Sequence, residues 1–268
     1  MSPRVTPRLW MALPAVVLVL ALSIVIGPLI ADALVPGDSP TDLAIFAAIV
    51  LAVLLIVAVP ALAALGWLRA VFFERKRVRA LVPTLLAFGP VIYFVYLIVT
   101  IGGGIGWEKV PLPLILVNLL LAALAGVGEE LAFRGVAVIT LRAKLGEVWV
   151  AVIPAVLFGL VHLINIGSGA PVADTLYQVV YAILYGFTLY AIRRVTGGLI
   201  VPIIVHTLNN GLEYIATAAG APTAVLAEGQ LLPNVVFMAG LVLGTIAMIL
   251  LVRNRANAPQ PFAVATPA

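Results

Sequence analysis

Long, unbroken runs of apolar residues dominate the sequence and leave few folds open to it. Hydrophobic residues make up 64% of the 268 residues and charged residues only 10%, whereas soluble domains are about 25% charged. Only helices and closed barrels satisfy every backbone hydrogen bond in lipid. The runs are continuous rather than alternating, so they predict an all-α, polytopic membrane helix bundle. The absence of cysteine excludes disulfides, thiol nucleophiles and thiolate metal sites.

The apolar runs divide into about eight predicted transmembrane helices, since each spanning helix needs about 20 mostly apolar residues. Their expected limits are 9–30, 43–70, 79–101, 112–141, 146–164, 175–192, 197–216 and 232–252. We expect four segments: two N-terminal helices with a basic loop (1–78), a helical core (79–216), a final helix (217–255) and a disordered, Pro-rich tail (256–268).

Positive charge alternates between the connections of these helices. Lys and Arg occur before the first helix and in alternate connections, at Arg4, Arg8, 69–79, 142–144, 193–194 and 253–255, whereas the connections between hold at most Lys109. Because cytoplasmic loops are the basic ones, both termini are expected in the cytoplasm (N-in/C-in). The first run also resembles a cleavable signal peptide followed by Ala31-Asp32-Ala33, but its length favours an uncleaved helix. The net charge of +4 does not point to nucleic acid.

The most polar stretch inside an apolar run is GEELAFRG, residues 128–135. Each ionisable residue at the centre of a membrane helix costs roughly 2.5–3.5 kcal/mol, so such groups face a protein interior or a water-filled cavity and indicate a functional site. Glu130 and Arg134 are four residues apart and can pair on one helix face, which predicts an internal ion pair. Glu129 has no local cation of its own, which favours a functional role.

The two histidines of the chain lie in other apolar runs, at the end of FGLVH (158–162) and the start of HTLNN (206–210). Glu129 and His162 each lie 16 residues from the turn near 145–146, about 24 Å along their helices. In an antiparallel hairpin they are level and can face each other. Asn210 shares a helix face with His206, and Phe158 lies one turn before His162, where it can back the imidazole.

These residue types favour hydrolysis by direct attack of water. A carboxylate beside an imidazole can activate a water, and a second imidazole and a carboxamide can donate to an oxyanion. No Ser or Cys forms a plausible dyad with either His, so an acyl-enzyme is unsupported. Zinc bound by both His and a Glu is an alternative, although HExxH is absent. Singly, each of these residues also fits helix packing, and Glu213 fits a pocket wall.

EExxxR, FxxxH and HxxxN, in this order on successive apolar runs, resemble the CPBP family of intramembrane proteases. This family includes the type II CAAX prenyl endopeptidases and bacteriocin-processing or immunity (Abi) proteins, and the similarity covers about residues 80–216. It implies an activated water at Glu129 and His162, an oxyanion site at His206 and Asn210, and supporting roles for Glu130, Arg134 and Phe158. It also implies a cavity open toward the cytoplasmic side.

We therefore expect a glutamate-type intramembrane endopeptidase that hydrolyses a peptide bond of a membrane-associated protein or peptide. Its expected location is a bacterial plasma membrane, with lipid and the peptide substrate as partners and with no cofactor, metal or nucleic acid. Two alternatives remain: a zinc-dependent metalloprotease that uses the same residues as ligands, and a non-catalytic scaffold, immunity protein or small transporter.

Overall fold

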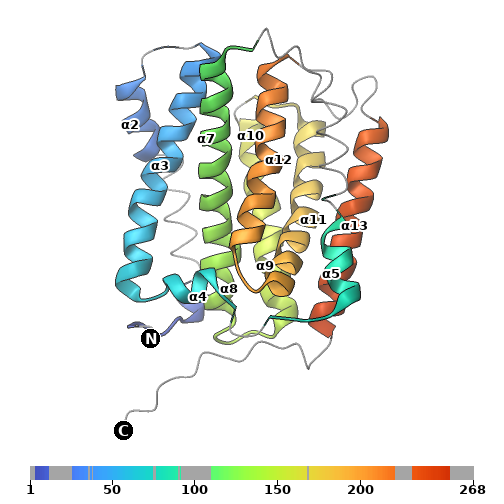
Figure 1. Cartoon of the computed structure of the whole chain (residues 1–268). Helices are drawn as coiled ribbons and strands as arrows, with labels where there is room; N and C mark the ends of the chain where they lie inside the picture. The colour runs from blue at the N-terminus through green and yellow to red at the C-terminus, as the bar shows by residue number, and fades with distance from the viewer. Residues whose placement is uncertain are drawn as a thin grey trace.

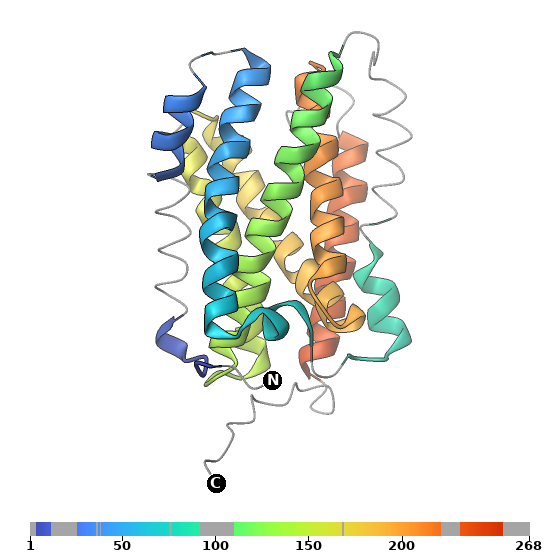
Figure 2. The ribbon, with the colours of Figure 1, turned by 60° about the vertical axis from the view of Figure 1, so that its left-hand side comes forward.

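The protein, seen in a computed structural model, is a bundle of roughly parallel and antiparallel helices (Figures 1 and 2). The structure describes residues 4–11, 26–35, 37, 39–74, 77–89, 91, 110–167, 169–220 and 231–253. Within these ranges the regular structure is helical apart from one antiparallel bridge between Phe73 and Gly198. The all-α class is therefore confirmed. Most of the predicted helix 9–30, the second half of 79–101 and the tail 256–268 lie outside the described residues.

The helical elements follow one another closely along the chain. In order they are η1 (Leu9–Met11), α2 (Gly27–Leu34), α3 (Pro40–Leu65), α4 (Leu68–Phe72), α5 (Leu81–Ala87), α7 (Leu112–Glu129), η4 (Glu130–Ala137), α8 (Val138–Leu141), α9 (Glu147–Leu160), η5 (Val161–Leu163), α10 (Ile164–Gly167), α11 (Val172–Thr196), α12 (Ile200–Ala218) and α13 (Leu231–Arg253). The elements α7, η4 and α8 together match the predicted helix 112–141.

Five described helices are long and apolar enough to cross a membrane, which makes this an integral membrane protein. They are Pro40–Leu65, Leu112–Leu141, Glu147–Gly167, Val172–Thr196 and Val235–Arg253. The helix α12 is not among the five, because polar residues interrupt its apolar sequence. The total of eight crossings and the orientation of the termini stay predictions.

The ends of α3 follow from local sequence. Ser39 and Asp42 form a capping box at its N-terminus, where the Ser39 side chain accepts from Asp42 N at 3.2 Å, and this satisfies backbone donors left over at a helix start. At its other end Gly66 adopts a left-handed conformation with φ 72°, which glycine does without a steric penalty. The predicted helix 43–70 therefore ends five residues early, and α4 is a separate short helix.

The central helix α7 lies between α3 and α12 (Figure 1). Its contact with α12 is close, because a Cβ added at Gly126 would lie 2.6 Å from Thr207 Oγ1 and 3.1 Å from Thr207 N. On the other side of the bundle α11 packs against α9 and α13. The helices that carry the predicted functional residues are thus held next to one another.

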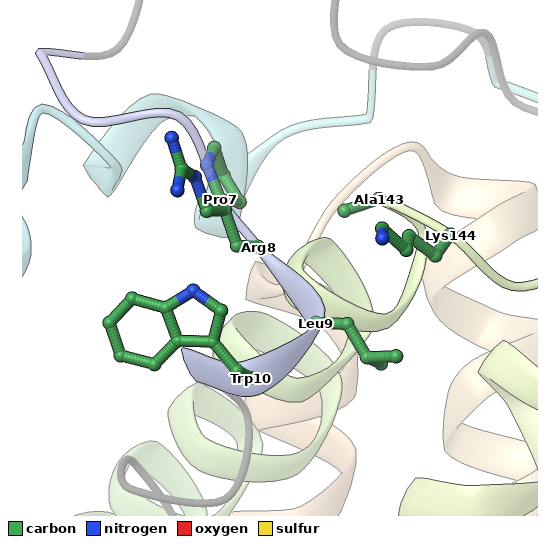
Figure 3. Close-up of a pocket in the computed structure, with 6 residues that line it drawn as sticks. All are labelled: Pro7, Arg8, Leu9, Trp10, Ala143 and Lys144. Atoms are coloured by element: carbon green, nitrogen blue, oxygen red, sulfur yellow. The ribbon is translucent and has the colours of Figure 1, made fainter.

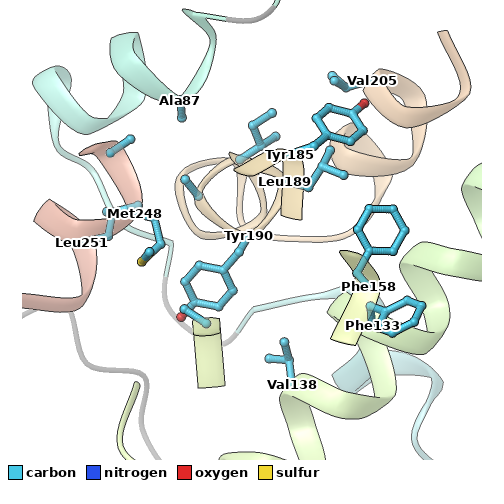
Figure 4. Close-up of a cluster of buried hydrophobic side chains, with 14 of the residues drawn as sticks. Ala87, Phe133, Val138, Phe158, Tyr185, Leu189, Tyr190, Val205, Met248 and Leu251 are labelled. Atoms are coloured by element: carbon cyan, nitrogen blue, oxygen red, sulfur yellow. The ribbon is translucent and has the colours of Figure 1, made fainter. Parts of the chain in front are cut away.

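A buried apolar cluster joins η4, α8, α9, α11 and α13. Phe133 and Phe158 lie side by side in it (Figure 4), with ring centroids 5.3 Å apart in an edge-on arrangement. Tyr185 and Leu189 from α11 complete this side of the cluster (Figure 4) and are at most 1% exposed. The cluster fixes the position of the GEELAFRG stretch against α9 and α11.

A second buried group consists of charges and lies at the end of the bundle where α4, α8 and the last turns of α11 and α13 meet (Figures 1 and 2). We call it the basic-end network; its members are Glu74, Arg142, Glu147, Tyr190, Arg193 and Arg194. Glu74 accepts from Arg142 at 2.9 Å and from Arg193 at 2.7 Å. Glu147 accepts from Arg142 at 2.6 Å, and from Tyr190 and Arg194. Two carboxylates thus bridge three arginines across the connections of four helices.

Candidate functional site

Two adjacent glutamates lie where α7 passes into η4, which is a π-helix. The wider π-turn is rare and often occurs at functional sites. The Glu130 side chain is fully buried, and Arg134 Nη1 donates to its Oε1 at 2.8 Å. The predicted ion pair is therefore confirmed. The Glu129 side chain, by contrast, is 33% exposed, so the two carboxylates occupy different environments despite being neighbours.

His206 from α12 contacts both glutamates. Its Nδ1 lies 3.0 Å from Glu130 Oε1, and its Nε2 lies 3.4 Å from Glu129 Oε2. The Glu130 oxygen already accepts from Arg134, and a carboxylate in such a pair only accepts, so Nδ1 of His206 carries a proton. Arg134, Glu130, His206 and Glu129 therefore form one continuous chain of contacts that ends at the exposed carboxylate.

Aromatic rings enclose His206 on two sides. Phe158 and Tyr185 both meet its ring edge-on, with centroids 5.7 Å and 5.4 Å away. The same Phe158 ring lies 4.3 Å from Arg134 Cζ, which is a cation–π distance. Only 2% of His206 is exposed. The imidazole is thus held in one orientation by rings as well as by its hydrogen bonds.

His162 lies in the 3-10 turn η5, directly after α9. Its Nδ1 lies 2.8 Å from the Phe158 carbonyl oxygen, and because a carbonyl only accepts, Nδ1 carries the proton. Nε2 of the neutral ring is then free to accept a proton. The Phe158 ring meets the His162 ring edge-on at 5.2 Å, as predicted. Since Phe158 contacts both imidazoles, the two histidines lie on either side of a shared neighbour.

Asn210 is 9% exposed and Asn209 8% exposed on α12. Asn209 Nδ2 donates to the Tyr181 hydroxyl at 2.8 Å and lies 3.5 Å from Asn210 Oδ1. If Asn210 accepts through its oxygen, its amide hydrogens stay available as donors. The predicted residue Asn210 is therefore part of a polar strip that continues through Asn209 to α11.

Sequence reasoning missed the contribution of α11. Tyr181 and Tyr185 are one turn apart on it, stack with centroids 5.6 Å apart, and reach Asn209 and His206 respectively. Tyrosines four residues apart on an apolar helix were the available signal, but this spacing is equally typical of ordinary core packing. Sequence reasoning also missed the contact between Glu130 and His206, since it joins residues 76 positions apart.

The structure places Glu213 differently from the other polar residues. It lies on α12 but is exposed on the surface of the bundle. The prediction that it lines a pocket wall is therefore not supported by its position, and Glu213 serves below as a matched control.

The donors do not gather as a metal site needs. Structural and catalytic zinc sites use at least three protein ligands. Within the described residues no group of three or more His, Asp or Glu side chains is arranged to hold a metal ion. His162 Nε2 and the Glu129 carboxylate have the chemistry of ligands, but the zinc alternative finds no third donor placed with them.

One pocket of about 580 Å³ lies away from this site, at the basic end of the bundle. Pro7, Arg8 and Trp10 line one side of it, and Ala143 and Lys144 line the other (Figure 3). It contains none of the residues that the sequence motifs single out.

The fold and the site together define an integral membrane protein whose helices bury a Glu-Glu-Arg cluster against a histidine. Residues 111–212 match the family of Rce1-like type II CAAX prenyl endopeptidases. This segment is a domain of that family, and it runs from the start of α7 into α12. The resemblance inferred from the three motifs is confirmed. No curated protein and no solved structure matched the chain.

The family domain implies an intramembrane protease of the CAAX type, and hence a protein or peptide substrate. All of the motif residues lie inside the matched segment. The segment begins later than the predicted core 79–216, so α5 lies outside the match.

Proposed function

We propose that this protein is an intramembrane endopeptidase that hydrolyses a peptide bond of a membrane-associated protein or peptide by direct attack of water. The observation that carries the proposal is the contrast between the two glutamates. Glu130 is closed off by Arg134 and His206, whereas Glu129 is 33% exposed and has only His206 beside it. A water or a substrate carbonyl can therefore reach Glu129.

In this mechanism Glu129 is the general base, and His162 assists it. Glu129 takes a proton from the attacking water while the new C–O bond forms, and it later gives that proton to the leaving nitrogen as the C–N bond breaks. The unprotonated Nε2 of His162 is a second acceptor for the water's other hydrogen. The water is then oriented by two acceptors from α7 and η5.

His206 and Asn210 are proposed to stabilise the oxyanion. Glu130 and Arg134 hold His206 through Nδ1, so its Nε2–H, when the ring is protonated, points to the side where Glu129 lies. The Asn210 amide is a second donor on the same helix, one turn further on. Donors that are fixed before the reaction need no reorganisation as charge develops, which is the usual source of their effect.

The proposal includes the orientation of the chain. The basic end of the bundle is taken as cytoplasmic under the positive-inside rule, with both termini on that side and the site open toward it. The helical core 79–216 then carries catalysis, while 1–78 and 217–255 contribute flanking helices in a bacterial plasma membrane.

The test compares membrane peptides from cells that carry the wild-type protein, Glu129→Gln or Glu213→Gln at equal membrane abundance. We expect a set of cleaved peptides that is lost in Glu129→Gln and retained in the exposed control Glu213→Gln. An unchanged set in Glu129→Gln would overturn the proposal. Cleavage that disappears on exhaustive chelation and returns only with zinc would favour the metalloprotease instead.

The scaffold alternative is separated by complementation of a deletion strain. A non-catalytic protein still complements as Glu129→Gln or His162→Gln, because each replacement keeps the size of the side chain. Loss of complementation in both variants, at normal membrane levels, supports the hydrolase.

A further inference from the structure

Arg193 is a fully buried arginine near the C-terminal end of α11 that the proposed mechanism does not use. Besides its ion pair with Glu74, its Nη1 donates to the carbonyl oxygens of Val71, at 2.9 Å, and of Arg134. Its Nη2 lies 3.3 Å from the Ala70 carbonyl oxygen. One guanidinium thus joins α11, the α4 segment and η4.

The carbonyl of Arg134 belongs to the π-helical turn that carries the site. A π-turn bonds each carbonyl to the amide five residues on rather than four, and a buried carbonyl needs a donor. Arg193 supplies one. The side chain of the same Arg134 pairs with Glu130, which in turn holds His206. A continuous path of contacts therefore runs from Arg193 to the imidazole beside Glu129.

The position of Glu74, which holds the other face of Arg193, is fixed by the backbone. Glu74 N donates to the Gly197 carbonyl oxygen at 3.0 Å, and Leu199 N donates to that of Phe72 at 3.0 Å. These bonds and the bridge between Phe73 and Gly198 tie the segment after α4 to the turn between α11 and α12. Gly198 allows the approach, since a Cβ there would lie 2.4 Å from Phe72 O.

We propose that Arg193, held by Glu74, is a positioning residue that fixes the π-turn and thereby sets the orientation of His206 relative to Glu129. The proposal rests on the proposed function for its catalytic consequence, but not for its structural one. Arg193 itself touches none of the groups assigned to the reaction.

The neighbouring arginine provides a matched control. Arg194 is also buried, at 2% exposed, and belongs to the same basic-end network. Its described contacts go to Glu147 and Tyr190 on α9 and α11. A loss of stability in the network is therefore common to Arg193→Lys and Arg194→Lys, whereas an effect on the π-turn is specific to Arg193→Lys.

The chain has two histidines, so protein labelled with ¹⁵N-histidine in lipid bilayers gives separate ring signals for His162 and His206, assigned with His162→Gln. We expect Arg193→Lys to shift the His206 Nδ1 signal and to leave His162 unchanged. Arg194→Lys is expected to leave both signals as in the wild type. An unshifted His206 signal in folded Arg193→Lys, or equal shifts in both arginine variants, would overturn the inference.

The catalytic consequence is measured on the Glu129-dependent peptides. We expect Arg193→Lys to reduce their formation about 10- to 100-fold at normal membrane abundance, the size of effect produced by a misplacement of about 1 Å, and Arg194→Lys to change it less than about threefold. Should Arg193→Lys fail to fold, Glu74→Gln keeps the arginine while removing its anion, and the same His206 shift is expected. If Glu129→Gln stays active, the proposed function fails, but the NMR comparison still decides the role of Arg193.

Discussion

The molecule buries two groups of carboxylates and arginines, and they differ in how completely their charges are matched. In the basic-end network each carboxylate accepts from two arginines, and each is at most 11% exposed. At the site, Glu130 shares one oxygen between Arg134 and His206, while Glu130 Oε2 and Arg134 Nη2 have no partner among the described residues. Glu129 remains open.

This difference separates a structural cluster from a reactive one. A buried ion pair whose hydrogen bonds are complete holds elements in place and has little reason to exchange protons. A cluster with incomplete hydrogen bonds and one exposed carboxylate retains the capacity to bind a water or a substrate. Mutations in the two groups should therefore affect different quantities, activity in one and stability in the other.

The largest expected effect is the loss of proteolysis in Glu129→Gln. General acid–base catalysis contributes about 10²- to 10⁴-fold, so the rate of peptide formation should fall by roughly this factor while the thermal midpoint stays near that of the wild type. Quantitative peptidomics and a thermal unfolding scan in the same membranes measure the two. A fall in the midpoint without a loss of cleaved peptides would reverse the assignment of the two groups.

Removal of the Glu74 charge should have the opposite pattern. Glu74→Ala leaves Arg142 and Arg193 buried without their shared anion, and breaking a buried pair costs about 3–5 kcal/mol. The membrane abundance and the thermal midpoint should fall strongly. Glu213→Ala, an exposed carboxylate on α12, is the control and should leave both unchanged.

The basic-end network should also make stability depend on acid. Burial by itself raises the pKa of Glu74, but the positive charges of Arg142, Arg193 and Arg194 outweigh it and lower the pKa from 4.5 to about 2. A carboxyl whose pKa is lowered on folding stabilises the fold above its unfolded pKa, and this contribution, at most about 3 kcal/mol, disappears as the pH falls from 4.5 toward 2.

Thermal scans at pH 7, 4.5 and 3 check this dependence. The wild type should lose more of its midpoint between pH 4.5 and 3 than Glu74→Gln, which starts lower and carries no titrating group at this position. Parallel curves for the two proteins would show that Glu74 does not supply the acid dependence.

The smallest expected effect concerns the helix contact beside the site. Gly126→Ala introduces a methyl group that would lie 2.6 Å from Thr207 Oγ1, and overpacking of this kind costs typically about 1–3 kcal/mol. We expect a moderate fall in the midpoint and a severalfold fall in activity, because α12 carries His206. The double variant Gly126→Ala with Thr207→Ser tests the cause: it retains the hydroxyl and should stay impaired, whereas Thr207→Ala with Gly126→Ala should recover.

Much of the fold and part of the site followed from the sequence, for identifiable reasons. Apolar runs determine where membrane helices lie, and the four-residue spacing of Glu130 and Arg134 determines their pairing. The edge-on contact of Phe158 with His162 is likewise local. That Glu129 and His162 jointly hold a water, with His206 and Asn210 at the oxyanion, stays a prediction.

The rest depends on contacts that no local pattern encodes. Glu130 reaches His206 across 76 residues, and Arg193 reaches Glu74 across 119. In the sequence Glu74 is one acid at the edge of a strongly basic loop, and nothing there tells which arginine it binds. The π-turn η4 has the same apolar composition as an α-helix, so hydropathy does not reveal it.

The π-turn makes the chain's chemistry sensitive to length as well as to residue type. A π-turn accommodates one residue more than the α-turn it replaces. Deletion of a single residue between Leu131 and Phe133 would let the helix close into regular α geometry, rotating all that follows by about 100° relative to α7. Such a chain would still insert and look hydrophobic throughout, yet its arginine would face a different neighbour from the glutamate it was paired with.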